Sequence, residues 1–134
     1  MAIDATGEGS GLGDEIEDRY KHTYRFSSGS IAAIEDTYYD KWCEGLFELG
    51  KFFDNGGSIS NQRLHEELLI AARTVKIDEK YYASREGSVF KATPKDDVTQ
   101  ALGRSPDLLD AAIMAAWIAS DVRERGHQKQ LLVW

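Results

Sequence analysis

The longest helical pattern in the chain opens with Ser-Pro-Asp-Leu-Leu-Asp-Ala-Ala, residues 105–112. Ser105 is a typical N-cap residue and Pro106 suits the first helical position, so the pattern predicts that a helix begins here. Asp107 and Asp110 are three residues apart, and a helix therefore places both carboxylates on the same face, one turn apart.

The two aspartates differ in how well an ordinary structural role explains them. An acidic residue in the first turn stabilises a helix by up to about 1 kcal/mol, which suffices for Asp107. Asp110 lies within a segment that is apolar nearly all round and that continues to about Arg123. Such a helix is usually buried, and a buried carboxylate needs either a partner or a metal ion. Asp110 is therefore the stronger candidate for metal coordination.

Upstream of this helix the chain alternates between helical and strand patterns. Residues 95–102 are typical of a short helix that ends at Gly103. Residues 75–80 and 88–93 have strand patterns and flank a turn at 84–87, which predicts a β-hairpin.

Apolar residues at helical spacing predict two further helices. One spans residues 37–54 and stops at the Asn-Gly-Gly of residues 55–57, and the other begins after an N-cap at Ser60 or Asn61. Three large aromatic side chains are expected in the core: Trp42, Phe47 and Trp117.

The chain starts with a strand pattern at Met1–Asp4 and a glycine-rich loop at residues 7–13; a short helix at Glu15–Tyr20 and a strand at His22–Ser27 follow. The glycines do not fit the spacing of a dinucleotide-binding motif, and no Gly-Lys-Ser/Thr completes a phosphate-binding loop. A flexible turn explains the loop more simply. Another interpretation centres on Asp4, because a carboxylate at the carboxyl end of a strand in an open α/β sheet lies where ligands and metals bind.

The 134 residues include 16 Lys and Arg against 23 Asp and Glu, a net charge of −7, and 42% are hydrophobic. This is the composition of an ordinary globular protein, with the length of one domain. The acidic balance argues against a surface that binds phosphate backbones all over. The single cysteine, Cys43, excludes an intrachain disulfide and favours a reducing, cytosolic setting. The sequence has no signal-peptide pattern and no apolar stretch long enough to cross a bilayer.

The acidic excess lies within residues 1–60, whereas residues 61–134 are balanced. Within the second half, residues 73–104 form a mildly basic strip. Its basic residues are Arg73, Lys76, Lys80, Arg85, Lys91, Lys95 and Arg104. Two interpretations stay open for this strip: a solvated hairpin with mixed charges, or an edge that faces a polyanion.

Asp4, Asp107 and Asp110 together could hold one or two hard divalent cations, because Mg²⁺ and Mn²⁺ prefer carboxylate oxygens and water. Two such ions about 3.5–4 Å apart stabilise the attacking and leaving oxygens of a phosphodiester during in-line hydrolysis. Clustered carboxylates bind the metal, and the metal in turn attracts the phosphate. An acidic protein can therefore still act on nucleic acid.

Residues 3–14 place a strand aspartate before alternating glycines, and residues 103–111 read Gly-Arg-Ser-Pro-Asp-Leu-Leu-Asp-Ala. These segments resemble the second and the last acidic motifs of the nuclease domain of tailed-phage terminase large subunits. Between them, Asn-Gly-Gly-Ser-Ile at 55–59, Glu-Glu-Leu at 66–68 and Lys-Asp-Asp at 95–97 follow the order usual in that family. The resemblance covers essentially the whole chain.

The resemblance implies an α/β fold of the RNase H-like type, in which carboxylates bind Mg²⁺ or Mn²⁺ to cut viral DNA. By position, Asp4 corresponds to the second metal ligand and Asp107 to the last, with Asp110 in support. Lys95 and Arg104 are expected near the DNA. The implied partners are double-stranded DNA, the ATPase-bearing N-terminal part of the terminase, the small terminase subunit and the portal. The implied location is the cytoplasm of an infected bacterium, away from membranes.

The first acidic motif of that family, and its ATPase domain, have no counterpart in residues 1–134. We therefore expect a single partial domain, RNase H-like but without its first strands, with an added β-hairpin. Its tail at 124–134 has no strong pattern and could be disordered. Such an endonuclease is expected to be weak or inactive alone, unless a partner supplies the missing strands.

Two other functions are weighed beside the nuclease. The alternative is a non-catalytic assembly protein that retains this fold and docks on DNA-packaging partners. A small nucleotide- or phosphate-binding α/β module is a third possibility, which the glycine spacing disfavours.

Overall fold

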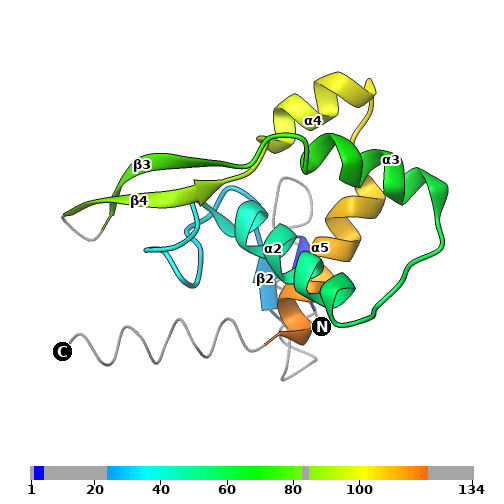
Figure 1. Cartoon of the computed structure of the whole chain (residues 1–134), viewed down its shortest axis with the longest axis horizontal. Helices are drawn as coiled ribbons and strands as arrows, with labels where there is room; N and C mark the ends of the chain where they lie inside the picture. Colours follow the sequence, from blue (N-terminus) through cyan, green and yellow to red (C-terminus); the bar gives the residue numbers. More distant parts are fainter. Residues whose placement is uncertain (1, 5–23, 83–84, 121–134) are drawn as a thin grey trace.

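The computed structural model describes residues 2–4, 24–82 and 85–120, and Figure 1 shows how these parts are arranged. In this part of the chain the architecture is a small α/β arrangement with four helices and an antiparallel two-stranded hairpin. The elements are β1 (Ala2–Asp4), β2 (Tyr24–Phe26), α2 (Lys41–Asp54), α3 (Gln62–Ala71), β3 (Lys76–Tyr82), β4 (Arg85–Lys91), α4 (Lys95–Leu102) and α5 (Asp107–Ala119).

The strands β1 and β2 form a parallel pair in which Asp4 lies opposite Phe26. Both strands were expected from the sequence, although β2 covers only the middle of the predicted segment 22–27. The pair lies against α5, and β1 contacts that helix directly. The helix predicted at 15–20 and the glycine loop fall outside the described residues.

Helix α2 begins at Lys41, four residues later than the apolar spacing predicts. Asp40 is its N-cap, with extended backbone angles and a carboxylate that accepts the Cys43 N–H at 2.9 Å. The residues before it pair with the hairpin instead, since Tyr39 N–H donates to Phe90 O at 2.9 Å and Phe90 N–H donates to Thr37 O at 2.8 Å. A strand-like bridge therefore replaces the predicted first turn. The predicted stop is confirmed, because the helix ends at Asp54.

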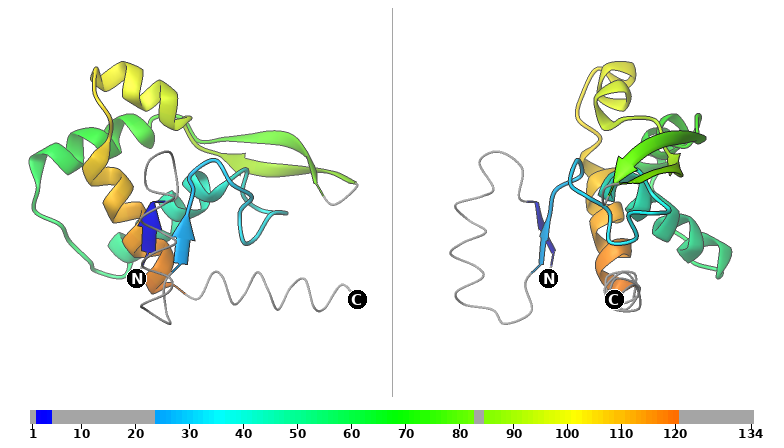
Figure 2. Two further views of the ribbon diagram at one scale, coloured as in Figure 1. Left: turned by 180° about the vertical axis from the view of Figure 1, so that it is seen from behind. Right: turned by 90° about the vertical axis from the view of Figure 1, so that its left-hand side faces the viewer.

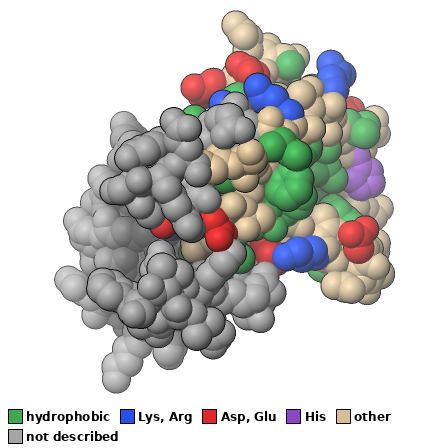
Figure 3. All heavy atoms as spheres, turned by 60° about the vertical axis from the view of Figure 1, so that its left-hand side comes forward, with side chains coloured by type: hydrophobic (Ala, Val, Ile, Leu, Met, Phe, Trp, Pro, Cys, Tyr) green, Lys and Arg blue, Asp and Glu red, His purple; other side chains and the backbone are tan. Residues whose placement is uncertain are grey.

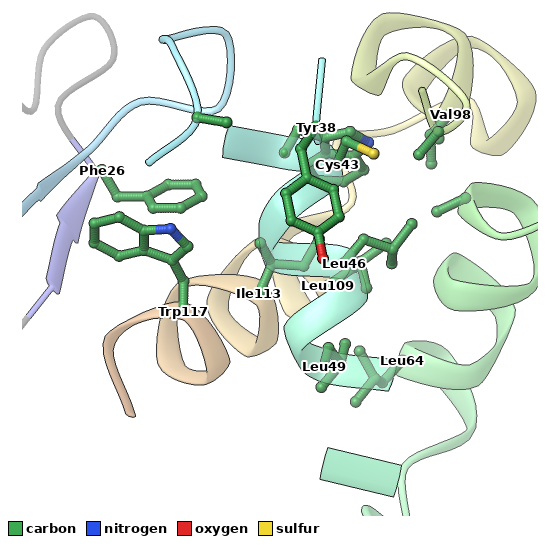
Figure 4. Close-up of a cluster of buried hydrophobic side chains, with 14 residues drawn as sticks. Phe26, Tyr38, Cys43, Leu46, Leu49, Leu64, Val98, Leu109, Ile113 and Trp117 are labelled. Carbon is green, nitrogen blue, oxygen red and sulfur yellow. The ribbon is translucent and has the colours of Figure 1, made fainter. Parts of the chain in front are cut away.

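The core forms where α2 packs against α5, with β2 and α3 closing its sides (Figure 4). The two helices approach closely at Gly45, where a Cβ atom would overlap the Cγ2 of Ile113. The rings of Phe26 and Trp117 meet edge to face with centroids 5.6 Å apart. Trp117 and Trp42 are buried as expected, while Phe47 is only partly buried.

Helices α3 and α4 confirm the sequence predictions closely. Asn61 rather than Ser60 caps α3, and its side chain accepts the Leu64 N–H at 3.0 Å. Helix α4 spans the predicted residues 95–102 and ends at Gly103, whose φ of 72° is the left-handed conformation that glycine adopts easily. Helix α3 contacts both α4 and α5.

The hairpin is also confirmed, with Ile77 opposite Phe90 in its antiparallel register. Its strands run closer to the turn than predicted, from residue 76 to 82 and from 85 to 91.

Helix α5 differs from prediction at both ends. Pro106 is the N-cap rather than the first helical residue, because its carbonyl accepts the first helical bond, from Asp110 N–H at 2.8 Å. The helix ends at Ala119, four residues before the predicted end. Ser120 is extended, with ψ of 162°, and its hydroxyl donates to Trp117 O at 2.8 Å. Residues 121–134, including the predicted tail, lie outside the described part.

Among the described residues, none of the helices combines the length and the apolar character needed to cross a membrane.

Candidate functional site

The first turn of α5 carries both aspartates that the sequence singled out. Asp107 is the first residue of the helix and is exposed, whereas the side chain of Asp110 is only 17% exposed. Pro106 has no side-chain group that can accept a hydrogen bond from the first turn. The N–H groups of this turn therefore need an acceptor from another element.

Glu67 of α3 supplies that acceptor. Its carboxylate is fully buried, and its Oε2 accepts the Leu109 N–H at 2.7 Å. Its Oε1 accepts a hydrogen bond from the Arg104 guanidinium and lies 3.6 Å from the Nε of Arg63. A negative charge at a helix N-terminus is favourable, and here it also fixes α5 to α3 and to the loop before α5. The candidate aspartates thus start from an anchored turn.

Sequence reasoning did not find this role for Glu67, although a signal was present. Glu67 shares the buried face of α3 with Leu64 and Ala71, at spacings of three and four residues. A glutamate at a core position of a helix is rare unless it is paired, so it marks a buried polar contact.

Asp110 has a cationic partner in the structure. The ammonium group of Lys95, the first residue of α4, forms an ion pair with Oδ2 of Asp110. The expectation that Asp110 is fully buried is wrong, but the expectation that it needs a partner holds. The ion pair also shows that the field at this carboxylate favours a positive charge, which fits a divalent cation in chemistry and in sign.

Asp4, the third predicted metal ligand, is described through its backbone. It ends β1, which runs alongside α5 with its arrowhead toward the N-terminal half of that helix (Figure 2). The strand end and the aspartate-bearing turn therefore lie toward the same end of the molecule. The side chain of Asp4 lies outside the described part. Within the residues that are described, no three His, Cys, Asp or Glu side chains gather as a metal-binding group.

The two basic residues expected near DNA both have acidic partners. Lys95 pairs with Asp110, and Arg104 pairs with the buried Glu67 while its side chain stays 33% exposed. Arg104 therefore has a structural contact in addition to any contact with DNA, and its role toward DNA stays a prediction.

A second buried carboxylate, Glu44 of α2, organises the opposite end of α5. It accepts the Ala33 N–H at 2.9 Å, the Ile34 N–H at 2.8 Å and the Trp117 Nε1–H at 2.7 Å. Lys41 lies with its ammonium 4.9 Å from the centroid of the Trp117 ring. Burial lowers the pKa of Lys41, and the negative charge of Glu44 opposes that shift. Glu44 is thus a structural anchor that the sequence analysis did not identify.

Cys43 has the properties of a core residue rather than a nucleophile. It is fully buried and its thiol donates to Phe90 O at 3.2 Å. Burial raises the pKa of the thiol to about 11, so the reactive thiolate is scarce at neutral pH.

The base of the hairpin presents aromatic and basic side chains together. The rings of Tyr38 and Phe90 each lie near Phe47, with centroids 5.2 Å from it in both cases. The ammonium of Lys91 lies 4.1 Å from the centroid of the Tyr39 ring. Figure 3 shows one face on which hydrophobic side chains reach the surface among charged ones. The large hydrophobic residues that are exposed are Ile31, Phe52, Leu69, Val75, Ile77 and Phe90.

Comparison with known proteins adds no relative: no family model matches the chain, and no curated protein or solved structure matches it significantly. The function is therefore argued from the residues and their geometry.

Proposed function

We propose that this chain is the C-terminal part of an RNase H-like nuclease domain of the kind found in phage terminase large subunits, which cuts double-stranded DNA with Mg²⁺ or Mn²⁺. The observation that carries the proposal is the first turn of α5. It presents Asp107 and Asp110, it is fixed by the buried Glu67, and it lies beside the strand that ends at Asp4.

In this proposal Asp4, Asp107 and Asp110 hold the metal. The bound ion supplies Lewis acidity and neutralises charge on the scissile phosphate. The chain's own residues do the positioning: Glu67 fixes the height and rotation of α5 through Leu109, and the helix then sets the spacing of the two aspartates. Positioning of this kind matters because small displacements of reacting groups cost large factors in rate.

The proposed partners follow from the same role. DNA would approach the aspartate-bearing end of α5, where Lys95 and Arg104 add positive charge. The ATPase-bearing part of a terminase, its small subunit and the portal would be the protein partners, in the cytoplasm of an infected bacterium. Completion by a partner would be needed for full activity, because the first acidic motif is missing from residues 1–134.

A non-catalytic assembly role is the second candidate, and a specific observation favours it. Asp110 already has a counter-charge within the chain, and the exposed Ile77 and Phe90 lie opposite each other on the hairpin. An apolar pair at the surface suits contact with a protein partner.

A plasmid-nicking assay distinguishes the two candidates. Supercoiled DNA is incubated with the chain and Mn²⁺, with and without the product of the neighbouring upstream reading frame, beside Asp107→Asn and Asp110→Asn. Asp96→Asn is the matched control, since Asp96 is an exposed acidic residue in the first turn of α4. We expect nicking that both site variants lose and the control keeps. Absence of nicking in every combination, or equal nicking by all variants, would refute the nuclease function.

A further inference from the structure

The ion pair between Lys95 and Asp110 joins the first turn of α4 to the first turn of α5. Its two side chains are 26% and 17% exposed, so water screens the pair less than it screens a pair on an open surface. Asp110 is one of the two described carboxylates in the proposed metal site. Its interaction with a lysine therefore bears directly on how a metal would bind.

A lysine ammonium and a divalent cation cannot share the oxygens of one carboxylate without strong repulsion, because both are positive and would lie within a few ångströms. Lysine differs from a metal ion in that its charge sits on a flexible four-carbon stem. The ammonium can therefore leave Asp110 without a change in the backbone of α4.

We propose that Lys95 is an internal substitute for the metal: its ammonium neutralises Asp110 in the metal-free chain and moves away when Mg²⁺ or Mn²⁺ binds. The displaced ammonium then becomes available to a phosphate oxygen of DNA beside the metal. This inference rests on the proposed metal site. It adds that the site binds lysine and metal in competition, so metal binding and exposure of the Lys95 charge are coupled.

The alternative is that the pair is a permanent contact that holds α4 on α5. The two possibilities predict opposite effects on metal affinity when Lys95 loses its charge. A permanent contact should leave affinity unchanged or lower it by loosening α5, whereas a competitor should raise affinity on its removal.

The test is calorimetric titration of the whole chain with Mn²⁺, together with thermal unfolding with and without the ion. The variants are Lys95→Met, Lys95→Arg and Asp110→Asn. Lys51→Met is the matched control, because Lys51 also pairs with a glutamate, Glu48 at 2.7 Å, but on α2. We expect Lys95→Met to bind Mn²⁺ roughly tenfold more tightly, within the 10–100-fold range typical of residues next to metal ligands. Lys95→Arg and Lys51→Met should bind as the native chain does, and Asp110→Asn should lose binding.

Thermal unfolding supplies an independent readout. Without metal, Lys95→Met should melt at a lower temperature than the native chain, and Mn²⁺ should raise its melting temperature by more. In the native chain, lysine side-chain NMR should show a Lys95 ammonium signal that changes when Mg²⁺ is added, a measurement that does not depend on any variant folding.

Each contrary result has a separate meaning. If Lys95→Met binds Mn²⁺ no more tightly than the native chain while Asp110→Asn loses binding, the competition is refuted and the metal site stands. If Mg²⁺ binds with no change in the Lys95 signal, the competition is refuted as well. If no variant and no native chain binds Mn²⁺ at millimolar concentration, the metal site itself is refuted.

Discussion

The carboxylate of Glu67 accepts the backbone N–H of Leu109 at 2.7 Å, across 42 residues of sequence. It does for α5 what an N-cap side chain does for most helices, but from a different helix. The cap therefore makes a tertiary contact as well as ending a helix, and removing it should loosen the candidate site and the α3–α5 packing together.

Glu67→Gln should destabilise the protein by about 1–3 kcal/mol, because the amide keeps the shape but loses the charge that binds Arg104 and the α5 N-terminus. The value should fall below the 3–5 kcal/mol typical of a broken, fully buried ion pair, since the Arg104 side chain is 33% exposed and can reach water. Urea denaturation measures the change. Glu66→Gln is the control, because its exposed side chain should leave stability within about 0.5 kcal/mol. Equal stabilities of the two variants would contradict the capping role.

Two glycines of α2 should respond oppositely to alanine. At Gly45 the new methyl group would overlap Ile113, and overpacking of this kind costs about 1–3 kcal/mol. At Gly50 nothing lies within 4 Å of the added Cβ, so the better helix propensity of alanine should stabilise by about 0.5–1 kcal/mol. Thermal melting of both variants checks the sign of each change. Stabilisation by Gly45→Ala would mean that α2 and α5 are not in close contact.

Glu44→Gln should be destabilising by about 1–3 kcal/mol, because one amide cannot accept from all three N–H groups that the carboxylate serves. The Trp117 Nε1–H or one of the two backbone N–H groups would face the amide nitrogen. Tryptophan fluorescence should also change, since Trp117 donates directly to this side chain. Native stability together with an unaltered emission spectrum would argue against the buried Glu44 contact.

Cys43 should make stability depend on alkaline pH. Its pKa is raised from 9.0 to about 11 in the folded protein, chiefly by burial, so the unfolded state loses this proton first as pH rises. The contribution is fully present below pH 9 and is lost between pH 9 and 11, on the order of 2 kcal/mol in total. Urea denaturation across this range should show a steeper fall for the native chain than for Cys43→Ala. The native thiol should also react with iodoacetamide far more slowly at pH 8 than the denatured one.

Local sequence signals predicted local structure well. The glycine at 103 and the cap at Asn61 define helix ends through their own backbone or side chain, and both were predicted from the residues alone. The start of α2 was wrong because Tyr38, although correctly spaced for the helix, bridges to Phe90, 52 positions later in the numbering. Spacing along the chain carries no information about such a partner.

The candidate site shows the same limit. Asp107 and Asp110 could be found because their spacing and apolar surroundings are local. The residues that hold them could not, because Glu67 and Lys95 contact them or their turn only through tertiary packing. Glu44 was missed for that reason as well, since its three donors come from the 33–34 segment and from Trp117.

The bond between Glu44 and Trp117 also has a consequence for synthesis on the ribosome. The two residues are 73 positions apart, and Trp117 is added among the last described residues. Until it emerges, a nascent chain holds the apolar face of α2 without the helix that covers it. Chains released before this point should therefore bind chaperones or be degraded, whereas complete chains should escape both.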